Sequence, residues 1–166
     1  DSRALPEDYM GTVGNTLGEL EQLPQFAQFA RQIQANGWIR PNKRIFDNAK
    51  VSDHFAIIPT LQAPKALPEI EAKLYDMVVK RFIAVFYPSA EFMVTTRIST
   101  VKAGGTDYNF QTNGKVLVNP GWLAVYGKEA QDEDANLVPV QPNEQVANEH
   151  VSVNALKTKP PARYTE

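Results

Sequence analysis

The stretch "PEIEAKLYDMVVKRFIAVFYPSAEFMVTTRISTVK", residues 68–102, decides the fold class because its hydrophobic period changes at Pro88. Before this proline, apolar residues recur every three or four positions, which predicts an amphipathic helix that begins at Pro68 and Glu69. After it, apolar and polar residues alternate as they do in a β-strand. We expect the apolar side of the helix to be core: Ile70, Leu74, Met77, Val78, Phe82 and either Val85 or Phe86.

The same two periods extend through each half of the chain. Residues 25–35 have helical spacing after Pro24, with Asn36–Gly37 as the stop. A Gly104–Gly105 turn and "YNFQTNGKVLV" predict a strand that pairs with the one after Pro88. Further strand candidates are "GWLAVYG" from Gly121, "NLVPV" from Asn136 and "VSVNALKTK" from Val151. The sequence therefore predicts an α+β fold, with a helical part at residues 1–88 and a β-rich part at residues 89–166.

Composition indicates an ordinary globular chain. With 166 residues and 43% hydrophobic content, it can bury a real core in one domain or two small ones. No apolar run approaches the ~18 residues of a membrane helix, and "DSRALPEDYM" lacks the features of a signal peptide. We therefore expect no membrane association and a cytoplasmic location. The absence of cysteine excludes disulfides, Cys-zinc sites and thiol nucleophiles.

Charge is unevenly distributed along the chain, although the net charge is only -2. Residues 40–50, "RPNKRIFDNAK", carry Arg40, Lys43, Arg44 and Lys50 against one acid, whereas residues 129–149 hold six acids and no Lys or Arg. On charge alone, the basic stretch fits a solvated surface as well as it fits a phosphate-binding one.

An Asp53–His54 pair lies inside the apolar run "VSDHFAIIPT", residues 51–60. On the bare sequence, a histidine satisfied within the fold is the better interpretation. A metal-dependent hydrolase would need further ligands, but the chain has two histidines, no cysteine and no H-x-x-x-H or H-x-H spacing. "KAGGTD" also lacks the spacing and the lysine of a nucleotide-binding loop.

Five blocks in order resemble the central region of the type IA DNA topoisomerases, and most closely the bacterial topoisomerase III branch. The blocks are "DSRALPEDY", "SDHFAIIPT", "YDMVVKRFIAVFYPSAEF", "GWLAVY" and "TKPPARYTE". The resemblance implies a central fragment in which residues 1–88 are the helical gate domain without its catalytic-tyrosine motif. Residues 89–166 would then be the C-terminal half of the β-rich arch domain.

The resemblance also implies a chemistry. In this family a tyrosine attacks single-stranded DNA and holds the broken 5′ end while another strand passes, before religation. Its motif is Tyr-x-Arg-Thr/Ser-Asp, and Asp1 matches the final Asp, so the nucleophile would lie four residues upstream. Mg²⁺ would be bound by the family's Toprim domain, which this chain lacks. We therefore expect the chain alone to be inactive and to hold no metal site.

Site residues follow from the same resemblance. His54, Ala56, Ile57 and Pro59 match the family's His-x-Ala-Ile-x-Pro, whose histidine lies near the scissile phosphate and assists cleavage or religation. Topoisomerase III members commonly have a second histidine where this chain has Phe55. Expected contacts to the DNA backbone are Ser2, Arg3, Arg40, Lys43, Arg44 and Lys50, with helix capping an equal alternative for Ser2.

Two expectations remain open on the sequence. A noncatalytic module that binds single-stranded DNA is the alternative function, because a basic loop and a β-rich half would suffice for it. Unpaired strand edges would allow self-association. Trp38 and Trp122 could stack on bases, but core packing is the preferred interpretation for both.

Overall fold

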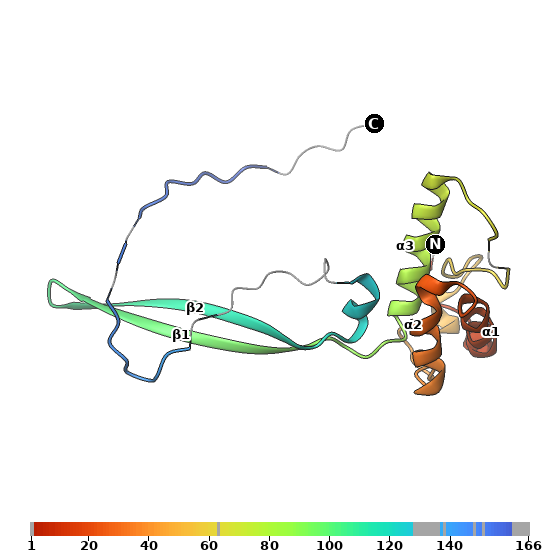
Figure 1. Cartoon of the computed structure of the whole chain (residues 1–166), viewed down its shortest axis with the longest axis horizontal. Helices are drawn as coiled ribbons and strands as arrows, with labels where there is room; N and C mark the ends of the chain where they lie inside the picture. The colour runs from red at the N-terminus through yellow and green to blue at the C-terminus, as the bar shows by residue number, and fades with distance from the viewer. Residues whose placement is uncertain are drawn as a thin grey trace.

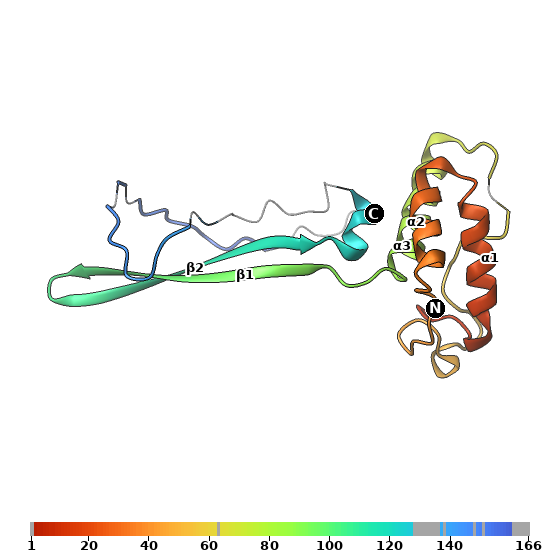
Figure 2. The same ribbon diagram turned by 60° about the horizontal axis from the view of Figure 1, so that its bottom comes forward.

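The computed structural model describes residues 2–62, 64–127, 137, 139–147, 149–150 and 152–160. Within these residues the α-helices are α1 (Met10–Leu20), α2 (Pro24–Ala35) and α3 (Glu69–Ala84). They gather at one end of the molecule, and the strands β1 (Glu91–Ala103) and β2 (Thr106–Asn119) project from them as a long ribbon (Figures 1 and 2). Short 3-10 helices are η1 (Glu7–Tyr9), η2 (Asn48–Lys50) and η3 (Gly121–Tyr126). The predicted α+β class, helices first and strands second, is confirmed.

One hydrophobic core joins the three helices. Each helix contributes side chains that are almost fully shielded from solvent, and the N-terminal segment and η3 complete the cluster. Phe26 of α2 is the largest fully buried side chain among the described residues, at 1% exposed. The core members include Leu5, Val13, Leu17, Leu20, Phe26, Ala30, Ile33, Phe46, Val79, Phe82, Ile83, Phe86 and Val125.

The expected core side of α3 is only partly correct. Phe82 and Phe86 are buried, but Ile70, Leu74 and Met77 are 82%, 56% and 60% exposed. The buried residues of this region all lie between Val79 and Phe86, where α3 meets α2 and η3. The first half of the helix extends beyond that contact, so Ile70, Leu74 and Met77 stay largely exposed while Tyr75 packs against the core.

Helix α1 was not predicted, because Gly11, Gly14 and Gly18 lower its helical propensity. The sequence pattern that indicates this helix is the spacing of Val13, Leu17 and Leu20, whose side chains are buried. The helix lies against α2: the Gln34 side chain donates a hydrogen bond to the Gly14 carbonyl (3.4 Å), and a Cβ at Gly18 would lie 4.0 Å from Gln34 Nε2, an ordinary van der Waals distance, so the packing does not require glycine there.

The ribbon is an antiparallel hairpin whose turn at Gly104–Gly105 is the predicted one. Both glycines have positive φ, 57° and 81°, as a tight primed turn requires. In the register Thr96 faces Asn113 and Thr100 faces Asn109, and each threonine hydroxyl bonds the opposing amide oxygen at 3.1 and 2.7 Å. Most side chains on both faces are exposed.

Three strand predictions do not match the structure. "GWLAVY" forms η3 instead of a strand, because Leu123 and Val125 turn inward against α3 while Trp122 is 38% exposed and not core. Residues 152–160 adopt no regular secondary structure, since no neighbouring strand pairs with them in the described part. Asn136, Val138 and Val151 lie outside the described residues, and Leu137, Pro139 and Val140 are not in a strand.

The ribbon is anchored to the helices at a tight crossing between Pro88, Ser89 and Gly121. The Trp122 amide donates to the Pro88 carbonyl at 3.0 Å. Beside it, Tyr87 donates to Gln32 Oε1 at 2.8 Å and meets the Trp38 ring at 4.8 Å, so Trp38 is half-buried as expected. Burial raises the pKa of Tyr87 to about 12.

Replacing Gly121 with alanine should destabilise this crossing. Gly121 has φ +47°, and an added Cβ would lie 2.5 Å from the carbonyl oxygens of both Pro88 and Ser89. We expect Gly121→Ala to lower the free energy of unfolding by at least about 2 kcal/mol, measured by urea unfolding. Gly11→Ala is the matched control, since a Cβ added there would have nothing within 4 Å; it should be neutral or stabilising by up to about 1 kcal/mol. An unchanged midpoint for Gly121→Ala would contradict this account.

Candidate functional site

The site is built around the N-terminal segment, which lies between two loops. On one side, the Leu5 amide donates to the Ile45 carbonyl at 2.7 Å and the Asp47 amide donates to the Leu5 carbonyl at 2.9 Å. On the other side, the Ala56 amide donates to the Ala4 carbonyl at 2.9 Å. The basic stretch at residues 40–50 and the segment that carries His54 are therefore brought together through Ala4 and Leu5.

Burial explains why this arrangement holds. Ala4 and Leu5 are only 2% and 3% exposed, and Leu5 and Phe46 both belong to the core. Backbone groups at a buried position must be hydrogen-bonded, so the two loops satisfy the N-terminal segment as strands would. The result places Ser2 and Arg3 at the same end of the molecule as His54.

Ser2 has a local role. Its hydroxyl oxygen accepts a hydrogen bond from the Ala4 amide at 2.9 Å and so stabilises a turn. The alternative of helix capping is wrong, because the first helical turn is η1 and its N-cap is Pro6. Arg3 is exposed.

The four basic residues of the 40–50 stretch differ in what their side chains contact. Lys43 pairs with Glu7 at 2.7 Å. Lys50 pairs with Asp47 at 2.9 Å and also donates to the Lys43 carbonyl at 2.8 Å. Arg40 donates through Nε to the Gly37 carbonyl at 3.0 Å, which leaves its other guanidinium N–H groups for a ligand. Arg44 is exposed and has no side-chain partner within the described residues.

The Lys43–Glu7 pair fastens the loop to the start of η1, whereas the Lys50–Asp47 pair lies within the loop. The hydrogen bond from Lys43 holds the pKa of Glu7 below its ordinary value, and the hydrogen bond from Lys50 does the same for the pKa of Asp47. The positive charges of Lys43 and Lys50 are thus partly neutralised within the chain. Among the described residues at this end, the uncompensated cations are Arg3, Arg40 and Arg44.

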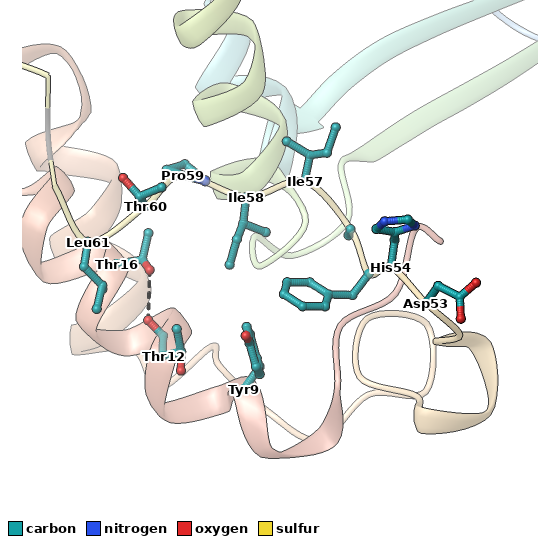
Figure 3. Close-up of a pocket in the computed structure, with 12 residues that line it drawn as sticks. Tyr9, Thr12, Thr16, Asp53, His54, Ile57, Ile58, Pro59, Thr60 and Leu61 are labelled. Atoms are coloured by element: carbon teal, nitrogen blue, oxygen red, sulfur yellow. Dashed lines mark hydrogen bonds between the residues drawn. The ribbon is translucent and has the colours of Figure 1, made fainter. Parts of the chain in front are cut away.

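His54 is exposed on an extended segment, residues 53–61, that crosses α1. Between this segment and α1 lies a pocket of about 450 Å³, with His54 among its lining residues (Figure 3). The Tyr9 and Phe55 rings meet edge to face there, with centroids 4.8 Å apart. Pro59 is buried and Ala56 and Ile58 pack against the core, so these three residues hold the backbone while His54 stays exposed. Ile57, the remaining apolar position of the motif, is 85% exposed.

Two kinds of site are not found in the part of the chain that the structure describes. No three His, Cys, Asp or Glu side chains in it come together to hold a metal ion. Nor does any helix there have the length and apolar character needed to cross a membrane.

The family model for DNA topoisomerase matches residues 1–166, which is the whole chain. This chain belongs to the DNA topoisomerase family. It is 37% identical to DNA topoisomerase 3 of Bacillus subtilis over 174 residues and 37% identical to that of Bacillus licheniformis over 173. DNA topoisomerase 3 of Shouchella clausii is 32% identical over 172 residues. All of this chain is covered in each match, but only 22–23% of each relative's length.

The predicted resemblance to the topoisomerase III branch is therefore confirmed. Most of the site residues predicted from the sequence lie at the same end of the molecule: Ser2 and Arg3, the basic stretch, and His54. Trp122 lies apart from them, on η3 after the ribbon. Sequence reasoning missed Glu7, the partner of Lys43, and Tyr9, the partner of Phe55. Neither has a local signal, because both contacts join segments more than 30 residues apart in the sequence.

The unequal pairing of the basic side chains predicts unequal effects on DNA binding. Arg44→Ala should weaken binding of a single-stranded oligonucleotide and reduce the slope of log K against log salt by about 0.7, the value for one phosphate contact. Lys43→Ala should change the slope less, because Lys43 already pairs with Glu7. Lys73→Ala, on α3 and paired with Glu69, is the control for loss of one positive charge. A larger loss of slope for Lys43→Ala than for Arg44→Ala would contradict the assignment.

Proposed function

We propose that this chain is the DNA-gate part of a type IA topoisomerase, which cuts one DNA strand, passes DNA through the break and reseals it. The break would be held as a 5′-phosphotyrosine. The supporting observation is the position of Ala4 and Leu5, bonded on one side to the basic stretch and on the other to the His54 segment. A tyrosine four residues before Asp1 in a longer polypeptide would enter the molecule along this same segment.

Few side chains would take part in the proposed cleavage reaction. The tyrosine oxygen would attack phosphorus and the 3′ oxygen of the neighbouring nucleotide would leave, so one P–O bond forms as another breaks. His54 is exposed and can donate a hydrogen bond to a phosphate oxygen or pass a proton to the leaving oxygen. Arg3, Arg40 and Arg44 would hold neighbouring phosphates without reading base sequence. The partner is single-stranded DNA, because the bond to be cut belongs to one strand.

Magnesium is part of the proposal only for the longer protein. The described residues contain no cluster of three metal-ligating side chains, so they do not fit a Mg²⁺ site. We propose that acidic residues of a Toprim domain, outside this chain, hold the ion, and that the enzyme works in the cytoplasm beside the chromosome. No step assigned to residues of this chain depends on the magnesium ion.

His54 should affect the rate of the reaction more than the binding of DNA. In the longer protein, His54→Ala should slow relaxation of supercoiled DNA by roughly 10- to 1000-fold, because one auxiliary hydrogen bond or proton transfer is lost. Affinity for single-stranded DNA should stay within a few-fold. His54→Gln keeps a hydrogen-bond donor but cannot titrate, so its rate separates the two roles. His150→Ala, at the other histidine, is the control. Relaxation by His54→Ala at the parent rate would show that the role is wrongly assigned.

The chain by itself should form no covalent adduct with DNA. None of its six tyrosines is followed two residues later by arginine. Burial raises the pKa of Tyr75 and that of Tyr87, the opposite of what activates a phenol. Single-stranded DNA labelled at its 3′ end, incubated with the chain and Mg²⁺ and then denatured with detergent, should therefore migrate free of protein.

The longer protein provides the contrasting arm of that experiment. It should trap an adduct on a tyrosine upstream of Asp1, and its failure to do so would favour a noncatalytic single-strand-binding module. An adduct on any of this chain's own tyrosines would mean that Asp1 does not match the end of the nucleophile's motif.

A further inference from the structure

The pocket beside His54 has the size and lining of a ligand site. On one side it is lined from α1 and the turn before it by Tyr9, Thr12 and Thr16, and on the other by Phe55, Ile58 and Leu61. Its volume of about 450 Å³ lies within the range of small-molecule pockets. Figure 3 shows Tyr9, Thr12 and Thr16 on the helical side, facing Ile58 and Leu61 across the hollow. The Thr16 hydroxyl is already satisfied, since it donates to the Thr12 carbonyl at 2.9 Å.

Aromatic surface is available at this pocket. Phe55 is 37% exposed even though its ring meets Tyr9 edge to face. An edge-to-face pair fixes both rings and leaves ring surface on which a flat ligand can stack. Leu61, 49% exposed, extends the apolar rim. A flat, largely apolar group with a few polar edges fits this lining, whereas a phosphate does not.

The residues around the pocket indicate which flat group it would bind. His54, the proposed phosphate contact, lines the same pocket, and the exposed Arg44 lies on the loop fastened to the His54 segment through Ala4 and Leu5. Cations that follow a backbone, together with exposed aromatic rings, are the combination by which proteins hold single-stranded nucleic acid. We propose that the Tyr9–Phe55 pocket takes one unstacked nucleobase of the strand whose phosphate lies at His54. This inference rests on the proposed function.

The proposal also gives Phe55 a role. Its ring can stack on a base but cannot form a charged contact. Phe55 is thus a positioning residue, which orients the strand across His54 by gripping a base. A base within a duplex remains stacked on its neighbours, so the pocket selects for single-stranded DNA.

The test compares two oligonucleotides of equal length and charge, one carrying thymine bases and one abasic throughout. Phe55→Ala should weaken binding of the 166-residue chain to the thymine oligonucleotide by about fivefold or more, the effect of losing one stacked base. It should leave the abasic oligonucleotide and the salt slope unchanged, because no phosphate contact is lost. Phe55→Trp should retain the parent affinity. Phe92→Ala on β1, 36% exposed in the parent, is the matched aromatic control.

A second measurement needs no substitution at all. An oligonucleotide with one 5-iodouracil, irradiated on the parent chain, should crosslink to Phe55 or Tyr9, as mapped by mass spectrometry. Crosslinks found only elsewhere would overturn the proposal, even if Phe55→Ala failed to fold.

The remaining outcomes separate this inference from the proposed function. If the parent chain binds both oligonucleotides equally and Phe55→Ala changes neither, the base site is wrong while backbone binding stands. If the parent binds neither, the proposed DNA gate fails and the base site fails with it. If Phe55→Ala has no effect in the longer protein, another part of that protein fills the pocket and the proposal is overturned.

Discussion

The backbone hydrogen bonds at Ala4 and Leu5 are the constraint on which the candidate site depends. The loops at residues 40–50 and 53–61 contain no α-helix or sheet strand of their own that could fix their positions. Each is instead tied to the same two buried residues, and losing a buried backbone hydrogen bond leaves a polar group without water. The distance between the basic stretch and His54 is therefore set by Ala4 and Leu5, which belong to neither of the two loops. Packing of Leu5 and Phe46 in the core makes that distance a property of the helical unit as a whole.

The ribbon of β1 and β2 is held in register by contacts within itself. Its register is local, fixed by the Gly104–Gly105 turn and by opposing threonine and asparagine side chains. Its connection to the helices depends on η3, which buries Leu123 and Val125 and crosses the chain at Pro88. The ribbon is therefore joined to the end of the helical unit through a close backbone contact.

Features set by local period could be predicted from the sequence, and features set by tertiary contacts could not. Helix α2 and the hairpin were predictable, because Pro24, Gly37 and Gly104–Gly105 mark their ends and the residues between them keep one period. Helix α1 was hidden by its three glycines, which lower helical propensity although its packing leaves room for a Cβ at each of them. "GWLAVY" looks like a strand by composition, but it begins at Gly121, whose positive φ turns the chain, and it forms a 3-10 helix that buries Leu123 and Val125. Within the candidate site, the motif at His54 could be recognised in the sequence, but the hydrogen bond from the Ala56 amide to the Ala4 carbonyl could not.

The Asp53–His54 pair inside an apolar run has a physical explanation in this arrangement. The run is not a buried strand: it is an extended segment whose Ala56, Ile58 and Pro59 pack inward while His54, Phe55 and Ile57 stay exposed. Apolar residues on the inner side fix the backbone, so His54 is held in place while it remains exposed to solvent. Its aromatic neighbour is exposed for the same reason. The proposed phosphate contact and the proposed base contact are thus consecutive residues, as phosphate and base are neighbours in every unit of a nucleic-acid strand.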